Sequence, residues 1–181
     1  MDVSGGLSRV LQLASKYELL KDNDAERAPI QNALAAIEGA ILLIDQIRCK
    51  IDQAYDITFA AKDSKDRSAR AQLAESYDEL RQIILALITS PVNEDCPLVG
   101  KERRNIDLQI GERTCYSIIP MYLDTPDRGL SLSVPRNAFR DDEDIHKTLE
   151  ELDRYLIKTD RIASNYRRDA EFLIARLQMK G

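Results

Sequence analysis

The residues of this chain that could support catalysis or bind a metal are few and widely spaced. There is one histidine, His146, beside the acidic run Asp141–Asp144, and there are three cysteines, Cys49, Cys96 and Cys115. The cysteine spacings match no zinc pattern, and the acidic run lacks the spacing of a calcium-binding loop. The sequence therefore predicts no metal site, and we interpret His146 as an exposed residue on a helix surface.

Covalent catalysis is disfavoured for a related reason. A serine or cysteine nucleophile needs a base within hydrogen-bonding distance, and one histidine cannot serve three cysteines and many serines. The only adjacent glycines are Gly5 and Gly6, so the chain lacks a glycine-rich phosphate loop. We therefore expect a non-enzyme without catalytic or cofactor-binding residues. Its cysteines are expected to be reduced thiols, with Cys49 exposed.

Length and composition indicate one soluble helical domain. The 181 residues are 44% apolar and 31% charged, with a net charge of −5, which disfavours a nucleic-acid partner. No unbroken apolar run approaches the roughly 18 residues of a membrane helix, and the first residues lack the pattern of a cleaved signal peptide. We expect no membrane insertion, and either a cytoplasmic location or export without a cleaved signal.

The most regular pattern is a coiled-coil repeat over residues 30–61. Its apolar positions follow steps of three and four, and large isoleucines alternate with small alanines, which lets a neighbouring helix approach closely. At about 1.5 Å per residue, this helix is a rod of roughly 45–50 Å. The stripe comprises Ile30, Ala33, Ile37, Ala40, Ile44, Ile47, Ile51, Ala54, Thr58 and Ala61.

Two further long helices are predicted, at 67–89 and at 142–179. The first follows a polar break with two candidate caps, Ser64 and Asp66, and ends before Pro91. The second begins at the acidic run, where the helix dipole favours negative charge. Three tyrosines on or beside the apolar stripes are expected to fill the core: Tyr55, Tyr77 and Tyr166.

Between the second and third long helices, the apolar period changes to two. Alternation at 106–110, β-forming residues at 114–119 and alternation at 130–134 predict two or three short strands, each with one exposed face. So small a sheet is not stable alone and must lie on the helices. Because the hairpin follows the second helix directly, we expect it on the N-terminal half of the first helix, away from Ala61.

Together these elements predict a mainly α fold. Residues 1–29 form a short N-terminal helix and a turn, and residues 30–181 form an elongated antiparallel three-helix bundle with a small sheet between its second and third helices. The buried centre of this bundle is expected to contain Ile37, Ile44, Ile51, Leu80, Ile84, Leu152 and Leu156.

Four stretches of the chain occur in an order that is specific to one group of proteins. They are a long helix at 33–54, a break and second helix at 63–80, a hairpin at 108–123 that begins with a hydrophobic-Gln-hydrophobic-Gly step, and a returning helix at 144–177. In this order they resemble the core domain of the bacterial flagellin and hook-filament-junction family, over roughly residues 30–178. The resemblance implies a flagellin core-domain-like fold and a role in the bacterial flagellum.

The chain departs from that family in several ways. It stops at Gly181, without the C-terminal segment that helps to form the inner tube of a filament, and the connection 124–140 replaces the variable outer domains. The first thirty residues lack the usual flagellin sequence, and cysteines are unusual in a filament subunit. From the missing tube segment we expect the isolated protein to be a monomer or small oligomer rather than a filament.

Two functions are compatible with the resemblance. The first is a structural or accessory component of the bacterial flagellum, exported without a cleaved signal. The second is a cytoplasmic, flagellin-mimicking assembly factor or co-chaperone that binds the flagellin export chaperone, flagellin itself or a flagellar regulator. Both functions imply flagellar proteins as partners. We expect the first function and keep the second as its alternative, and the sequence does not identify the partner.

Overall fold

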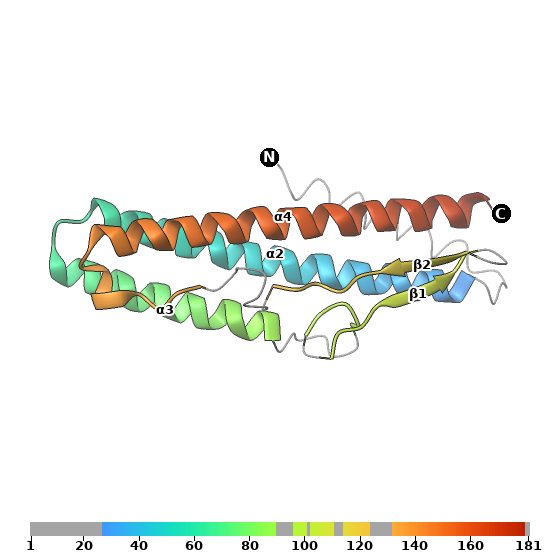
Figure 1. The fold of residues 1–181 in the computed structure, drawn as a ribbon, viewed down its shortest axis with the longest axis horizontal. Coiled ribbons are helices and arrows are strands. Elements are labelled where there is room, and N and C mark those ends of the chain that lie inside the picture. The colour runs from blue at the N-terminus through green and yellow to red at the C-terminus, as the bar shows by residue number, and fades with distance from the viewer. Residues whose placement is uncertain (1–26, 90–95, 101, 111–113, 124–131, 180–181) are drawn as a thin grey trace.

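A computed structural model describes residues 27–89, 96–100, 102–110, 114–123 and 132–179. Within these residues the chain is mainly α-helical, with a small two-stranded antiparallel sheet, and forms an elongated rod (Figure 1). The elements, in order, are α2 (Arg27–Asp63), α3 (Arg67–Thr89), β1 (Ile106–Gln109), β2 (Cys115–Ile118), the short 3-10 helix η2 (Arg136–Phe139) and α4 (Asp142–Met179). Of the predicted N-terminal segment 1–29, residues 27–29 belong to α2 and the rest lies outside the described residues.

The central element is α2, which packs against both α3 and α4. Its predicted stripe is buried along its full length, from Ile30 to Ala61. Ile41 and Leu43, to either side of the stripe, are buried as well, because α2 has a neighbouring helix on two sides. Each isoleucine buried in this way contributes about 1.5–3 kcal/mol to stability.

The turn between α2 and α3 is fixed by side chains of the polar break. Asp66 caps α3, since its carboxylate accepts hydrogen bonds from the backbone N–H groups of Ser68 and Ala69, both at 3.2 Å. Ser64, the other candidate cap, instead accepts a bond from the N–H of Asp66 at 3.3 Å. A short turn of this kind brings α3 back antiparallel to α2.

The start of α4 has the charge pattern expected from the helix dipole. Asp142, Glu143 and Asp144 lie in its first turn, and the backbone oxygen of Asp141 accepts the N–H of Ile145 at 3.4 Å. From there α4 runs antiparallel to α2, so the start of α2 and the end of α4 lie at the same end of the rod (Figure 1).

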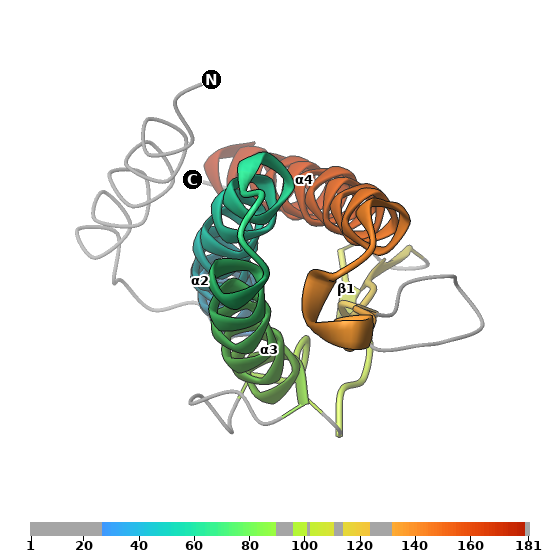
Figure 2. The same ribbon diagram turned by 90° about the vertical axis from the view of Figure 1, so that its left-hand side faces the viewer.

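The helices differ from the predicted bundle in one respect. Of the predicted centre, Ile37, Ile44, Ile51, Ile84 and Leu152 are buried and Leu80 and Leu156 are partly buried in the same core. However, α3 packs mainly on α2 and on η2, which lies between α3 and α4 (Figure 2). The described part of the bundle is therefore α2 with a helix on each of two sides, and residues 132–140 fill the space between those two helices.

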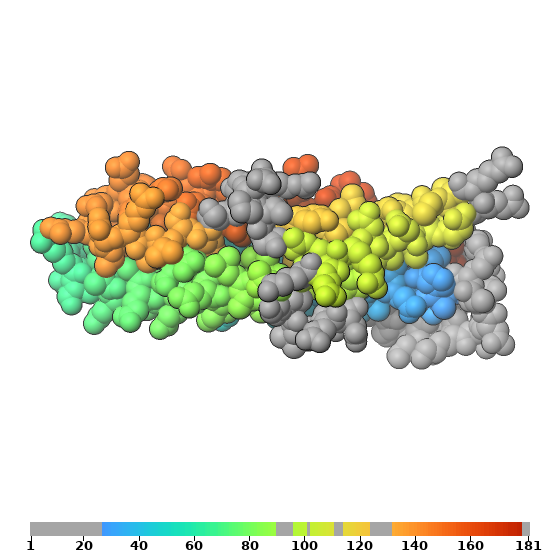
Figure 3. Space-filling model, turned by 60° about the horizontal axis from the view of Figure 1, so that its bottom comes forward, coloured from blue at the N-terminus to red at the C-terminus, as the bar shows by residue number. Residues whose placement is uncertain are grey.

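The hairpin lies where it was predicted to lie. β1 and β2 pair in register from Ile106 opposite Ile118 to Gln109 opposite Cys115. β1 contacts α2, and a groove of about 550 Å³ between them is lined by the first three turns of α2, from Pro29 to Ala36. Residues 102–110 and 114–118 continue the row begun by α3 along the rod (Figure 3), so they cover the part of α2 that α3 does not reach.

The predicted strand at 130–134 was wrong for the described residues 132–134, which belong to no strand. Leu132 is buried but Val134 is 58% exposed, although a strand would place both on one face. The physical reason is that the backbone of Ser133 bonds to side chains: its N–H donates to Glu151 at 2.8 Å, and its oxygen accepts the hydroxyl of Tyr77 at 3.2 Å. These contacts satisfy the peptide groups without a neighbouring strand.

The expectation that no stretch is long and apolar enough to cross a membrane also needs correction. By length and composition alone, α2, which lies near the N-terminus of the chain, passes that test. Polar residues interrupt the apolar ones in α2, so the helix contains no unbroken apolar run of that length. In the structure, Ile37, Ile41 and Ile44 of α2 are buried against other elements, and the core helices of water-soluble proteins pass the same test.

Candidate functional site

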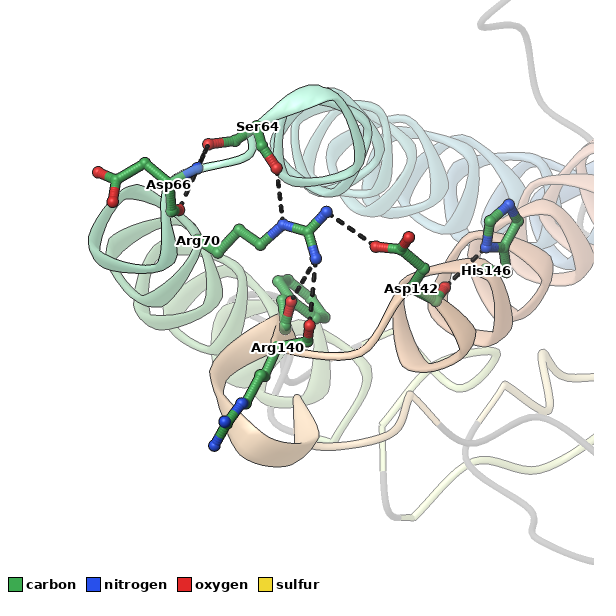
Figure 4. Close-up of polar contacts among 7 residues, drawn as sticks. Ser64, Asp66, Arg70, Arg140, Asp142 and His146 are labelled. Carbon is green, nitrogen blue, oxygen red and sulfur yellow. Dashed lines mark hydrogen bonds and ion pairs between the residues drawn. The ribbon is translucent and has the colours of Figure 1, made fainter.

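The polar side chains that the fold brings together most closely surround Arg70, at the end of the rod where α2 turns into α3. Its guanidinium group donates to the backbone oxygen of Ser64 at 2.8 Å and to the backbone oxygens of Phe139 at 3.5 Å and Arg140 at 3.2 Å. It also forms an ion pair with Asp142 at 2.8 Å (Figure 4). One side chain therefore joins the α2–α3 turn, the end of η2 and the start of α4.

A second polar contact ties the same connecting segment to α4. Glu151 of α4 is 9% exposed and accepts two bonds from Ser133, from the backbone N–H at 2.8 Å and from the hydroxyl at 2.7 Å. Tyr77 of α3 donates to the backbone oxygen of Ser133 from the other side at 3.2 Å. Burial, followed by the nearby charge of Glu151, raises the pKa of Tyr77, so Tyr77 remains a neutral donor.

The hairpin is held by a third set of contacts, at the other end of the rod. The hydroxyl of Tyr116 in β2 donates to the carboxylate of Asp169 at 2.6 Å, and its ring stacks on Phe172 with centroids 4.5 Å apart. Burial raises the pKa of Tyr116 to about 12, with a further contribution from the bond to Asp169. Close by, the buried thiol of Cys96 donates to the backbone oxygen of Ala36 at 3.2 Å.

The residues singled out for chemistry lie apart from one another. Cys49 and Cys115 are exposed and Cys96 is buried, and all three are free thiols, so the prediction for Cys49 is confirmed. His146 is exposed, as predicted, with its Nδ1 2.7 Å from the backbone oxygen of Asp142. Among the described residues, no three histidine, cysteine or acidic side chains are grouped as a metal site would require.

The tyrosines are core residues, as predicted. Tyr77 and Tyr166 are buried, and Tyr55 is partly buried against the core. The hydroxyl of Tyr166 donates to the backbone oxygen of Ile119 at 3.2 Å. Burial is the main cause that raises the pKa of Tyr166. Tyr77 and Tyr166 therefore stabilise the packing of the connecting segments on the helices.

The surface of the rod is chemically uneven, and the contrast is sharpest between α2 and α4. We define the α2 outer face as Ala28, Gln31, Ala35, Gly39, Leu42, Gln46, Cys49 and Gln53, which recur at helical spacing and are exposed or half-buried. Every one of these residues is uncharged. Leu42, near the middle of the face, is 42% exposed. Charged residues such as Glu38 and Lys50 lie beside the face, and Asp56, seven residues after Cys49, is the first charged residue in the same series.

The corresponding surface of α4 has the opposite character. We define the α4 outer face as Glu150, Asp153, Arg154, Ile157, Asp160, Arg161, Ser164 and Arg168, all of which are exposed. All but Ile157 and Ser164 are charged. Such a face is well solvated, whereas the α2 outer face offers a partner helix a surface with no charge to desolvate. The α2 outer face is therefore the candidate interaction surface.

Sequence reasoning missed the residues that hold the connecting segment. Arg70 carries a signal that could have found it, because a cation near the N-terminus of a helix is disfavoured by the helix dipole and α3 has no acidic residue in its first turn. Glu151 and Ser133 carry no such signal, because their pairing joins distant parts of the chain.

The chain was compared with protein-family models, with curated proteins and with solved structures, and none of them matches it.

Proposed function

We propose that the protein is a non-enzymatic, flagellin-like component of the bacterial flagellum, with a structural or accessory role. The observation that carries the proposal is the order and direction of the elements: a long helix, a shorter antiparallel helix, a hairpin and a long returning helix. This is the order that the sequence resemblance to the flagellin core domain implies. The proposal includes the finer description of the fold as a flagellin core-like bundle.

The elongated shape supports this proposal. A rod in which α2 and α4 run nearly the whole length (Figure 1) can pack side by side with other rods over a long contact. The uncharged α2 outer face suits such packing, because helices approach closely where small and uncharged residues face each other. We therefore assign the α2 outer face as the contact with a helix of another flagellar axial protein.

The arrangement of polar groups supports a non-enzymatic role. The hydrogen-bonding groups of Arg70, Tyr77 and Glu151 bind backbone atoms, Ser133 of the connecting segment or, for Arg70, also the carboxylate of Asp142. The open hollow of about 580 Å³ next to Arg70 is lined by both cationic and anionic side chains, among them Lys65, Arg140 and Glu143, and so has no clear preference for a charged ligand.

One observation favours the second candidate function, a cytoplasmic assembly factor that mimics flagellin. Cys49 and Cys115 are free and exposed, and exposed thiols persist in the reducing environment of a cytoplasm more readily than outside the cell. Such a factor would use the same α2 outer face to bind the flagellin export chaperone, flagellin or a regulator.

Locating the protein separates these functions. We would tag it at its chromosomal locus, shear and purify the flagella, and measure the protein by immunoblot in the flagellar and cytosolic fractions, with immunogold electron microscopy of the flagella. A cytoplasmic protein with the same tag is the control. We expect the protein in the flagellar fraction. Recovery in the cytosol together with flagellin or its chaperone would favour the second function, and recovery without any flagellar protein would contradict both.

A further inference from the structure

Residues 132–140, which we call the strap, form the structural link between α3 and α4. Most of the packing of α3 is on α2 and on η2, and η2 also contacts α4. Phe139 of the strap is fully buried and packs against Tyr77 of α3, with ring centroids 5.4 Å apart. The position of α3 relative to α4 therefore depends on how the strap packs between them.

The backbone of the strap is strained at three consecutive residues. Asn137, Ala138 and Phe139 have φ values of 46°, 53° and 55°, which place them in the left-handed region. Asparagine tolerates this region, but each alanine or larger residue there costs roughly 1–2 kcal/mol. A conformation of this kind persists only where the surrounding structure holds it.

Three anchors hold the strap in this conformation. Arg70 donates to the backbone oxygens of Phe139 and Arg140, at the end of the left-handed run. The side chain of Phe139 fills the site beside Tyr77. Glu151 binds Ser133 near the beginning of the strap. The same guanidinium that holds the strap also binds the α2–α3 turn and Asp142 (Figure 4), so its release would loosen all three elements together.

We propose that the strap is a conformational latch with two states and that Arg70 is its lock. In the closed state the strap is left-handed, Phe139 is buried and α3 is coupled to α4 through it. In the open state Arg70 no longer binds the backbone oxygens of Phe139 and Arg140, and residues 137–139 return to the right-handed or extended regions of backbone conformation. α3 is then packed on α2 alone. Closure stores backbone strain, so opening recovers part of the energy of the lost contacts. The proposal does not depend on the proposed function.

The lock is tested by Arg70→Lys, measured by hydrogen exchange of the full chain with residue resolution. Lysine keeps the charge near Asp142 but loses the planar fork of donors. The amides of Ser133 and Arg140, which bond to Glu151 and to the backbone oxygen of Asn137, should exchange roughly ten-fold faster, while amides at the centre of α2 are unchanged. The matched control is Arg81→Lys, since Arg81 lies on the same helix and pairs with Asp78 within that helix.

The strain is tested by Ala138→Gly, which should slow amide exchange in the strap, whereas Arg70→Lys should speed it. Glycine adopts the left-handed conformation without steric cost, so the closed state should become more stable relative to the open state. The amides of Ser133 and Arg140 should then exchange roughly two- to five-fold more slowly. In the Arg70→Lys background, Ala138→Gly should restore much of the lost protection. If the left-handed conformation at Ala138 carried no strain, glycine would instead speed the exchange of these amides, because the open chain would gain conformational freedom.

Two outcomes would overturn the proposal. The first is that Arg70→Lys leaves the exchange of Ser133 and Arg140 unchanged, or changes it no more than Arg81→Lys does. The second is that Ala138→Gly speeds exchange of the strap. Circular dichroism of each variant establishes that the helices remain folded, so that neither result reflects global unfolding.

Discussion

The outer faces of α2 and α4 differ although the two helices are almost equal in length and bury apolar stripes of the same period. The α4 outer face is covered with charges, whereas the α2 outer face has none. A helix that only needs to be soluble is well served by charges, as on α4. The comparison teaches that the inner faces determine the fold, while the outer faces determine which partners can approach the rod.

α2 does carry charged residues at the boundary where it packs against α4. Arg48 of α2 is paired with Asp160 of α4. Asp45 of α2 is near Arg167 and Arg48, but burial outweighs these charges and raises the pKa of its carboxyl group. The uncharged character of α2 is therefore specific to its outer face.

The largest expected difference in stability is between two variants that place the same charge on the inner or on the outer face of α2. Ile44→Asp buries a carboxylate in the core, where Ile44 is 1% exposed, and should cost several kcal/mol of the roughly 5–15 kcal/mol that stabilise a domain. Leu42→Asp should change stability by less than about 0.5 kcal/mol. Thermal and denaturant unfolding followed by circular dichroism measure both, and equal stability of the two variants would contradict the assignment of faces.

The next largest loss of stability should affect one end of α2 and not the other. Leu108→Ser removes a buried side chain from the hairpin face that lies over the N-terminal half of α2 and should cost about 2–4 kcal/mol. Hydrogen exchange should become faster at residues 34–41 and change little at 51–61. Equal loosening of both parts, or loosening at 51–61 alone, would mean that the hairpin does not stabilise this half of α2.

A smaller effect is expected where the hairpin contacts α4. Tyr116→Phe keeps the ring on Phe172 but removes the bond to Asp169, which should cost about 1–2 kcal/mol near neutral pH. Urea unfolding of both proteins measures this difference. A variant as stable as the wild type would show that the bond contributes nothing.

The same pair of proteins has an expected pH dependence. In the folded state the pKa of Tyr116 is raised to about 12, against about 10 for an unfolded tyrosine. The folded state therefore keeps this proton at a pH where the unfolded state has lost it. The contribution is fully present below about pH 10 and is lost as the pH rises through about 12, so the stability difference between wild type and variant should shrink over that range.

The smallest effect is expected at the edge of the charged face. Asp160→Asn removes the pair with Arg48, in which the two side chains are 51% and 29% exposed, and should cost less than about 1 kcal/mol. The loss should be smaller still at high salt, because salt screens exposed pairs. A loss of several kcal/mol in urea unfolding would mean that the α4 outer face contributes to the fold as strongly as the inner face.

Much of the fold could be predicted from the sequence because the information is local. The steps of three and four predict α3 and α4, and the polar break, Pro91 and the acidic run predict where they begin or end. Alternation predicts β1, and a run of β-forming residues predicts β2. The strap could not be predicted in this way. Its alternation of Leu132 and Val134 imitates a strand, while its conformation depends on Arg70, Tyr77 and Glu151, which are distant in the sequence. The α2 outer face is visible in the sequence only after the buried face is known.

The central claim is that the α2 outer face binds a flagellar protein, and one paired substitution tests it most directly. Leu42→Glu and Ile157→Glu each place the same charge on an exposed aliphatic residue, the first on the α2 outer face and the second on the α4 outer face. Both variants should fold as the wild type does. In cells, Leu42→Glu should lose its association with flagella or flagellar proteins, measured by fractionation and co-purification, while Ile157→Glu keeps it. Equal association of both variants, or loss with Ile157→Glu alone, would contradict the account.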